Sequence, residues 1–147
     1  MNGNRKLLKS KSNQEGNISF GHLNIRSLHS KIDQVSHIVK QYNYDVFAVC
    51  ETWLDDTIAD SEIAIDGYDI YRRDRSNDTR GGGVCLYVKQ MLDFTVRNDL
   101  QDINIESLWG EVKCRKSSFP PKYEMHCCKS FINHKLKLCW KCVTVIM

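Results

Sequence analysis

The hydrophobic pattern is clearest at residues 46–50, where five consecutive apolar or thiol residues (VFAVC) run directly into Glu51. A strand with one face in solvent would alternate polar and apolar residues, so this unbroken run predicts a strand covered on both faces. Glu51 then lies at the carboxyl end of a buried strand. Because a carboxylate there is costly unless it is compensated, we expect a metal ion, an arginine or hydrogen-bond donors beside it.

The residues before this run predict a strand followed by a helix. Residues 18–24 (ISFGHLN) alternate apolar with small residues, which indicates a strand that ends at Asn24. Residues 31–42 show close to helical spacing of apolar side chains, with Ser30 as the expected cap of the helix N-terminus. The apolar helix positions are Ile32, Val35, Ile38, Val39 and Tyr42.

Strand, helix and strand together predict a βαβ unit. The two strands of such a unit are parallel and its crossover is right-handed, so their carboxyl ends lie at the same edge of the sheet. We therefore expect Asn24 and Glu51 to be close, within about 5 to 10 Å if the strands are neighbours.

The later part of the chain predicts strands without intervening helices. Apolar runs indicate strands at residues 68–72, 84–89, 94–96 and 107–113. Residues 55–66 are acidic and read as a loop, and residues 72–80 mix arginines with aspartates, which indicates a salt-bridged surface connection. Residues 81–83 are three glycines that lead into a strand. Successive strands of this kind pair antiparallel, so the predicted fold is α/β with a mixed sheet.

Charge divides the chain into three segments. Residues 1–17 carry four Lys or Arg against one acid, residues 18–111 carry nine against sixteen, and residues 112–147 carry eight against one, within a formal net charge of +3. Basic ends on an acidic body are compatible with nucleic-acid contact, although solvated tails are commoner. The predicted segments are a disordered basic leader (residues 1–17), one domain (residues 18–113) and a divergent basic, Cys-rich tail (residues 114–147).

Cysteine usage and hydropathy bear on the compartment. The seven cysteines are an odd number, and the N-terminal residues are polar and basic without an apolar signal-peptide core. No apolar run approaches the roughly 18 residues that a membrane-spanning helix needs. We therefore expect an intracellular protein of the nucleus or cytoplasm, with reduced thiols and no membrane partner.

Four stretches, taken in their order and spacing, carry a resemblance to a known family. They are LNIRSLHSKID, DVFAVCETWL, GYDIYRRDR and RGGGVCLYVK. Together they resemble the N-terminal half of the endonuclease domain of non-LTR retrotransposons (LINE elements), a branch of the endonuclease/exonuclease/phosphatase superfamily that includes apurinic endonucleases. The resemblance covers residues 18–113. It implies an incomplete four-layer α/β sandwich and a hydrolase that cleaves DNA with Mg²⁺ or Mn²⁺ and without a small-molecule cofactor.

The resemblance also implies roles for single residues. Glu51 matches the metal-binding glutamate of the family, and Asn24 matches its active-site asparagine. This agrees with the chemistry, because Mg²⁺ prefers carboxylate oxygens and an amide can orient a phosphate without adding charge. Arg26, His29 and Lys31 lie between Asn24 and the helix, where contact with a nucleic-acid backbone is expected. The alternatives are that Glu51 caps a helix or pairs with arginine, that Asn24 forms a turn, and that the basic residues are solvated.

The resemblance stops before the second half of the family's site. The Gly-Asp-Phe-Asn-like motif and the late Ser-Asp-His motif are absent, and His126 and His134 stand in other contexts. General-base assistance contributes about 10² to 10⁴ in rate, so we expect the chain to be weakly active or inactive alone. A half-sandwich would also expose a sheet face, which predicts self-association.

Two other classes of function remain open. The first is a zinc module in the tail, built from Cys139, Cys142 and the upstream residues His126, Cys127, Cys128 and His134. The second is non-catalytic nucleic-acid binding through the basic ends, which would weaken steeply with salt and would not respond to Glu51→Ala.

Overall fold

The computed structural model describes residues 18–75, 81–103, 106–113, 122–132, 135–138 and 144–146. The predicted leader, residues 1–17, lies outside the described residues. The strands are β1 Phe20–Asn24, β2 Val46–Cys50, β3 Tyr68–Arg73, β4 Val84–Lys89, β5 Asp93–Val96, β6 Glu106–Lys113, β7 Lys122–Ile132, β8 Lys135–Leu138 and β9 Thr144–Ile146. The helical elements are η1 His29–Lys31, α1 Ile32–Tyr42, η2 Asp60–Ile63 and η3 Asn98–Leu100.

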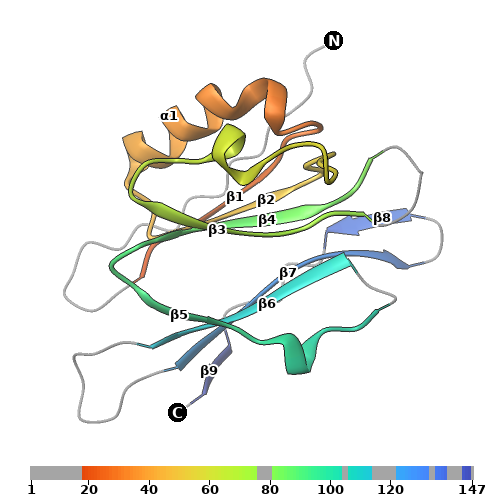
Figure 1. The fold of residues 1–147 in the computed structure, drawn as a ribbon. Helices are drawn as coiled ribbons and strands as arrows, with labels where there is room; N and C mark the ends of the chain where they lie inside the picture. Colours follow the sequence, from red (N-terminus) through yellow and green to blue (C-terminus); the bar gives the residue numbers. More distant parts are fainter. Residues whose placement is uncertain are drawn as a thin grey trace.

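The first sheet has the strand order β1-β2-β4-β3 (Figure 1). Strands β1 and β2 are parallel and joined by α1, while β4 pairs antiparallel with both β2 and β3. The predicted βαβ unit and mixed sheet are therefore confirmed. The central position of β2 explains its unbroken apolar run, because both of its faces are covered.

Helix α1 starts and ends differently from its prediction. It begins at Ile32 after the short helix η1, and no side chain caps its N-terminus, so the predicted capping by Ser30 is wrong. Ser30 lies inside η1, where its own backbone is already helical. The helix ends where Asn43 adopts a left-handed φ of 51° and donates its N–H to Lys40 O at 3.1 Å. Tyr42, predicted to be apolar core, is 39% exposed.

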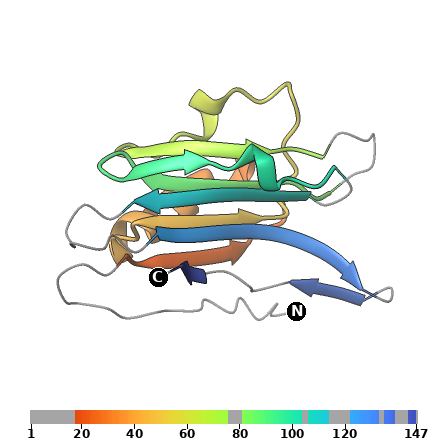
Figure 2. The same ribbon diagram turned by 90° about the horizontal axis from the view of Figure 1, so that it is seen from below.

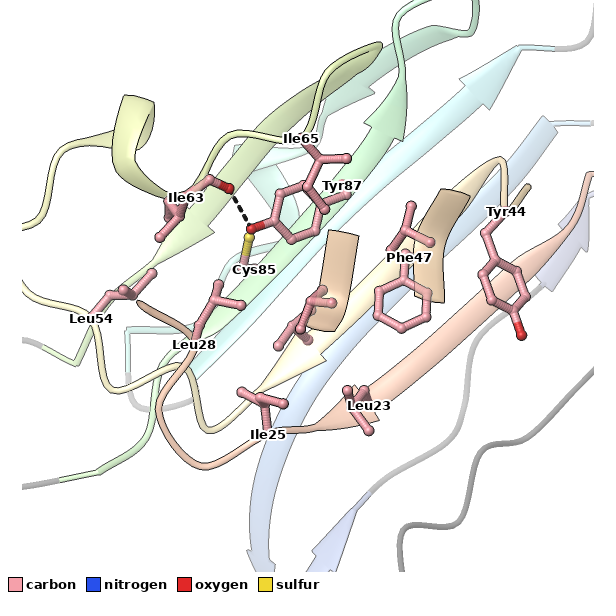
Figure 3. Packing of buried hydrophobic residues seen from close by; sticks show 13 residues of the cluster. Leu23, Ile25, Leu28, Tyr44, Phe47, Leu54, Ile63, Ile65, Cys85 and Tyr87 are labelled. Carbon is pink, nitrogen blue, oxygen red and sulfur yellow. Dashed lines mark hydrogen bonds between the residues drawn. The ribbon is translucent and has the colours of Figure 1, made fainter. Parts of the chain in front are cut away.

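Side chains between α1 and the first sheet form one hydrophobic core (Figure 3). Val35 and Val39 of the helix are fully buried there. The acidic segment predicted to be a loop also contributes, because it contains η2 and buries Ile63 and Ile65. The Tyr87 hydroxyl donates to Ile63 O at 2.7 Å, which ties this segment to β4.

The second sheet has the order β5-β6-β7-β8, with β9 also paired to β7, and it packs below the first sheet (Figures 1 and 2). The interface between the sheets is apolar and contains Val46, Cys50, Val84, Leu86 and Val88 from the first sheet and Leu108 and Val112 from β6. The layers are thus helix, sheet and sheet. The single α-helix of the described residues covers the first sheet, so the outer face of the second sheet carries none.

Strand β7 lies beyond the domain boundary predicted at residue 113. It pairs antiparallel with β6 along the whole of that strand, from Glu106 opposite Lys129 to Lys113 opposite Lys122 (Figure 2). The tail, predicted to be poorly patterned, therefore contributes strands to the second sheet. In the described part of the chain, no helix has the length and apolar character required to cross a membrane.

Candidate active site

Asn24 and Glu51 stand at the same edge of the first sheet, as predicted. In the parallel pairing of β1 with β2, Asn24 lies opposite Cys50, the residue before Glu51. The ladder continues past the strand ends, where Ile25 N–H donates to Cys50 O at 3.0 Å. Both side chains are half-buried. The backbone register therefore brings Asn24 and Glu51 to the same edge, one position apart.

Two loops form this edge: the β1 loop (residues 25–28) and the β2 loop (residues 51–54). Backbone hydrogen bonds join them, with Ser27 N–H donating to Glu51 O at 2.9 Å and Leu28 N–H donating to Thr52 O at 2.8 Å. The non-glycine residues with positive φ in these loops are Arg26 (49°), Ser27 (75°), Glu51 (58°) and Trp53 (54°). Left-handed backbone costs about 1–2 kcal/mol at each L-residue, and such strain concentrates at functional sites.

The glycine segment (residues 81–83) holds the other side of the β2 loop. Trp53 N–H donates to Gly82 O at 2.9 Å, and Thr52 N–H donates to Gly83 O at 3.3 Å. Gly83 has φ 83°, and a Cβ there would lie 2.3 Å from Thr52 Oγ1. The segment leads into β4 as predicted, and its hydrogen bonds also fix the position of the loop that carries Glu51.

Hydrogen-bond donors, rather than a helix, hold the Glu51 carboxylate. Its Oε2 accepts from Trp53 Nε1 at 2.9 Å and from Gly82 N–H at 3.1 Å. The hydrogen bond to Glu106 is the main cause that raises the pKa of the Arg75 guanidinium. The charge of nearby Glu51 also contributes to raising this pKa. Of the expected compensating groups, both the ring of donors and the nearby arginine are therefore present.

Glu106 is a second carboxylate beside this edge, and the sequence analysis missed it. One of its oxygens accepts from Arg75 Nε and the other accepts from Gly83 N–H, the latter at 3.0 Å. Glu51 and Glu106 are thus bound by consecutive amides of the glycine segment. No local pattern links positions 75 and 106, and the alternation of the β6 region predicted only a strand. Of the other arginines in residues 72–80, Arg72 is bonded to Asp74 at 2.9 Å as predicted, whereas Arg73 donates to Gln101 Oε1 at 3.0 Å and Arg80 lies outside the described residues.

The three residues predicted to bind nucleic acid have different surroundings. Arg26 is exposed at the tip of the β1 loop. Lys31 Nζ donates to Ile25 O at 2.8 Å and also to Arg26 O, so this side chain closes the same loop. His29 Nε2 lies 3.2 Å from Glu62 Oε2 and connects the loop region to η2.

A divalent cation such as Mg²⁺ binds oxygen ligands, of which this edge offers the Glu51 carboxylate. Within the described ranges, no three His, Cys, Asp or Glu side chains come together in a group suited to a metal. Mg²⁺ often binds one or two carboxylates and retains several waters, so the Glu51 carboxylate fits as one ligand of such a site. Cys50 and Cys85 are buried, and no disulfide joins them. For the zinc alternative, His134, Cys139 and Cys142 lie outside the described residues.

A comparison with protein families matches residues 17–134 to the endonuclease/exonuclease/phosphatase family. The chain belongs to this family. The match reaches into β7, past the predicted boundary at residue 113, and it agrees with the α/β architecture of the structure. The endonuclease/exonuclease/phosphatase assignment extends over both sheets and over both residues of the candidate edge. A comparison with curated proteins found no match.

Solved structures of similar fold span more than this chain. The human Nocturnin catalytic domain with bound sulfate superposes with a TM-score of 0.51 at 12% identity, covering 85% of this chain and 52% of that one. Truncated Caenorhabditis elegans TDP2 gives a TM-score of 0.46 at 20% identity, covering 74% and 43%. An AP endonuclease from Archaeoglobus fulgidus gives 0.43 at 15% identity, covering 67% and 37%. This endonuclease/exonuclease/phosphatase chain therefore spans about half of the Nocturnin domain that shares its fold.

Proposed function

We propose that this chain carries the metal-binding part of a phosphodiesterase site that cleaves DNA with Mg²⁺ or Mn²⁺. The observation that carries the proposal is that the ends of the paired strands β1 and β2 bring Asn24 and Glu51 to one strained sheet edge, in a chain of the endonuclease/exonuclease/phosphatase family. Glu51 is the cation ligand, and Asn24 is the amide that orients a phosphate oxygen. Arg26 is the cation of this edge that contacts the DNA backbone, while Lys31 and His29 support its loop.

Phosphodiester hydrolysis explains why this edge is built in this way. A phosphodiester repels hydroxide, and a divalent cation held by Glu51 would supply the charge that offsets this repulsion. The two donors on Oε2 of Glu51 fix the direction of the carboxylate. The Asn24 side chain can donate to a phosphate oxygen or accept from a water without adding charge.

We propose further that the chain is the first half of a retrotransposon-derived domain and is weakly active or inactive alone. Four motifs in order support this origin, and the two motifs that would supply the second carboxylate and the histidine are absent from the sequence. Loss of the general base alone corresponds to about 10²- to 10⁴-fold in rate. We also propose that chains associate through an exposed sheet face. The face of the first sheet away from α1, which was expected to be exposed, is covered by the second sheet, so the face proposed for association is the outer one of the second sheet.

Cation binding at Glu51 is the measurement that tests this proposal most directly. Trp53 Nε1 lies 2.9 Å from Glu51 Oε2, so a Tb³⁺ ion on this carboxylate would emit when tryptophan is excited. We expect luminescence that Mg²⁺ and Mn²⁺ displace, that Glu51→Gln abolishes and that Asp66→Asn, an exposed acid elsewhere, retains. Equal luminescence in the wild type and in Glu51→Gln would contradict the proposal.

Plasmid nicking tests the chemistry itself. Conversion of supercoiled plasmid to open circles is expected to be slow, to require Mg²⁺ and to stop with EDTA. Glu51→Gln should remove the activity, and Asn24→Ala should reduce it. Nicking that persists in Glu51→Gln would assign the cleavage to another site or to a contaminant.

A further inference from the structure

Trp53 is a large aromatic side chain at the edge that carries Glu51. Its exposed fraction is 37%, and it lies two residues after the candidate cation ligand. The other exposed large hydrophobic residues of the described chain are Tyr42, Met91, Leu100 and Ile103, all outside the β2 loop. An aromatic ring kept at the surface beside a candidate phosphodiester site needs a physical reason.

The position of the indole is set by two hydrogen bonds, by its contact with Gly81 and by the backbone conformation of Trp53. Trp53 N–H donates to Gly82 O at 2.9 Å, and Nε1–H donates to Glu51 Oε2 at 2.9 Å. A Cβ on Gly81 would lie 3.4 Å from Nε1 and 3.8 Å from Cε2, so the ring edge lies against backbone that carries no side chain. The backbone of Trp53 has φ 54°. Few non-glycine residues adopt this conformation, and for an aromatic residue it carries a cost.

A loop with an exposed cation lies beside the loop that carries the ring. The β1 loop is bonded directly to the β2 loop through Ser27 N–H and Leu28 N–H. Its exposed Arg26 supplies a cation there, and Lys31 Nζ is bonded to the Arg26 carbonyl. Cations that follow a phosphate backbone, combined with an aromatic ring that stacks a base, are the recurring elements of sites for unpaired nucleic acid.

We propose that Trp53 is the stacking platform for an unpaired base of a DNA strand whose phosphate lies at the Asn24–Glu51 edge. The base must be unpaired or extruded, because both faces of a base inside a duplex are already stacked. This inference rests on the proposed function and adds a specificity residue to it. The indole then has two separable parts: its N–H orients Glu51, and its ring contacts DNA.

Substitutions at Trp53 separate these two parts. Trp53→Phe keeps an aromatic ring and loses the N–H donor to Glu51, whereas Trp53→Leu loses both. We expect single-stranded DNA to bind Trp53→Phe within about threefold of the wild type and Trp53→Leu about tenfold or more weakly, the scale of base–aromatic stacking. Tyr42→Leu is the matched control, because Tyr42 has similar exposure at the opposite end of the βαβ unit.

The direct measurement uses DNA that carries 2-aminopurine and the full chain with Trp109→Phe and Trp140→Phe, so that Trp53 is the single tryptophan. Stacking predicts that binding quenches both 2-aminopurine and Trp53 emission. The proposal is overturned if neither emission changes in bound complexes, or if Trp53→Leu binds and quenches 2-aminopurine as the wild type does. Because the double variant retains Trp53, the measurement stands even if Trp53→Leu does not fold.

The same samples distinguish this inference from the proposed function. Glu51→Gln should lose Tb³⁺ luminescence and nicking while it keeps the 2-aminopurine quenching, which depends on the ring. Quenching without any cation binding in the wild type would retain the platform and reject the phosphodiesterase site. Cation binding without quenching would retain the phosphodiesterase site and reject the stacking platform.

Discussion

Arg75 and Glu106 form an ion pair that joins the two sheets beside Glu51. Arg75 follows β3 in the first sheet, and Glu106 is the first residue of β6 in the second. The exposed fractions of the two side chains are 21% and 18%, so solvent screens the pair only in part. The second oxygen of Glu106 binds Gly83 N–H at 3.0 Å, which connects the pair to the segment that clamps the Glu51 loop.

We expect Arg75→Met to destabilise the fold and to strengthen cation binding at Glu51. The substitution leaves the Glu106 carboxylate without its partner, which should lower the free energy of unfolding by about 1–3 kcal/mol at this burial. It also removes a positive charge that interacts with Glu51. Urea unfolding and Tb³⁺ titration measure the two effects. Lys40→Met, at an exposed position, should change neither, and weaker Tb³⁺ binding in Arg75→Met would contradict the prediction.

Gly83→Ala and Gly67→Ala form a matched pair for the glycine segment. Both glycines have positive φ, 83° and 85°, so each alanine pays the left-handed backbone cost of about 1 kcal/mol. Only at Gly83 would the new Cβ meet an atom, 2.3 Å from the buried Thr52 Oγ1, whereas at Gly67 nothing lies within 4 Å. We expect Gly83→Ala to cost a further 1–3 kcal/mol or so in urea unfolding. Equal losses of unfolding free energy at the two positions would contradict this expectation, because they would show that the β2 loop accommodates the new Cβ at no cost.

Tyr87 and Tyr44 allow a comparison of two buried hydroxyls. Tyr87 donates to Ile63 O at 2.7 Å, while the buried Tyr44 hydroxyl has no hydrogen-bond partner among the described residues. Removing the Tyr87 hydroxyl leaves a buried carbonyl unsatisfied, so Tyr87→Phe should cost about 1–2 kcal/mol. Tyr44→Phe should be neutral or slightly stabilising. Thermal and urea unfolding of the two variants measure these changes in stability. A larger loss of stability in Tyr44→Phe than in Tyr87→Phe would contradict the prediction.

Asp45 should make the stability of the fold depend on acid. Burial raises the pKa of Asp45, but hydrogen bonds from Ser19 and Lys89 together with the Lys89 charge outweigh it and hold the pKa below its ordinary value of 3.8. The folded state therefore binds the proton less readily than the unfolded state. The stabilisation is complete above the unfolded pKa and is lost as pH falls through the lower folded pKa.

Asp45→Asn removes this acid dependence. The Asp45 carboxylate accepts from Ser19 N–H at 2.7 Å and from Lys89 Nζ at 2.9 Å, so its loss should cost about 1–3 kcal/mol at pH 6. The wild type and the variant should converge as unfolding is repeated at pH values below 4. A constant difference between them from pH 6 to pH 2.5 would show that the effect is not ionic.

The edge at which the candidate site lies could be predicted from the order of residues alone. An apolar run predicts a covered strand, helical spacing predicts the crossover, and the handedness of βαβ units then brings Asn24 and Glu51 together. Every step uses local periodicity or chain connectivity, and the pairing of Asn24 opposite Cys50 confirms the result. The strands up to β6 were found for the same reason.

The partners that surround this edge could not be predicted before the fold was known. The bonds from Gly82 to Glu51, from Arg75 to Glu106 and from His29 to Glu62 join different elements, and no spacing rule relates their positions. The start of α1 illustrates the same limit, because a short helix in the β1 loop region displaced the expected Ser30 cap. Periodicity reports which face of an element is buried. Side-chain partners depend on how loops from separate elements are brought together, and that is settled by packing over the whole fold.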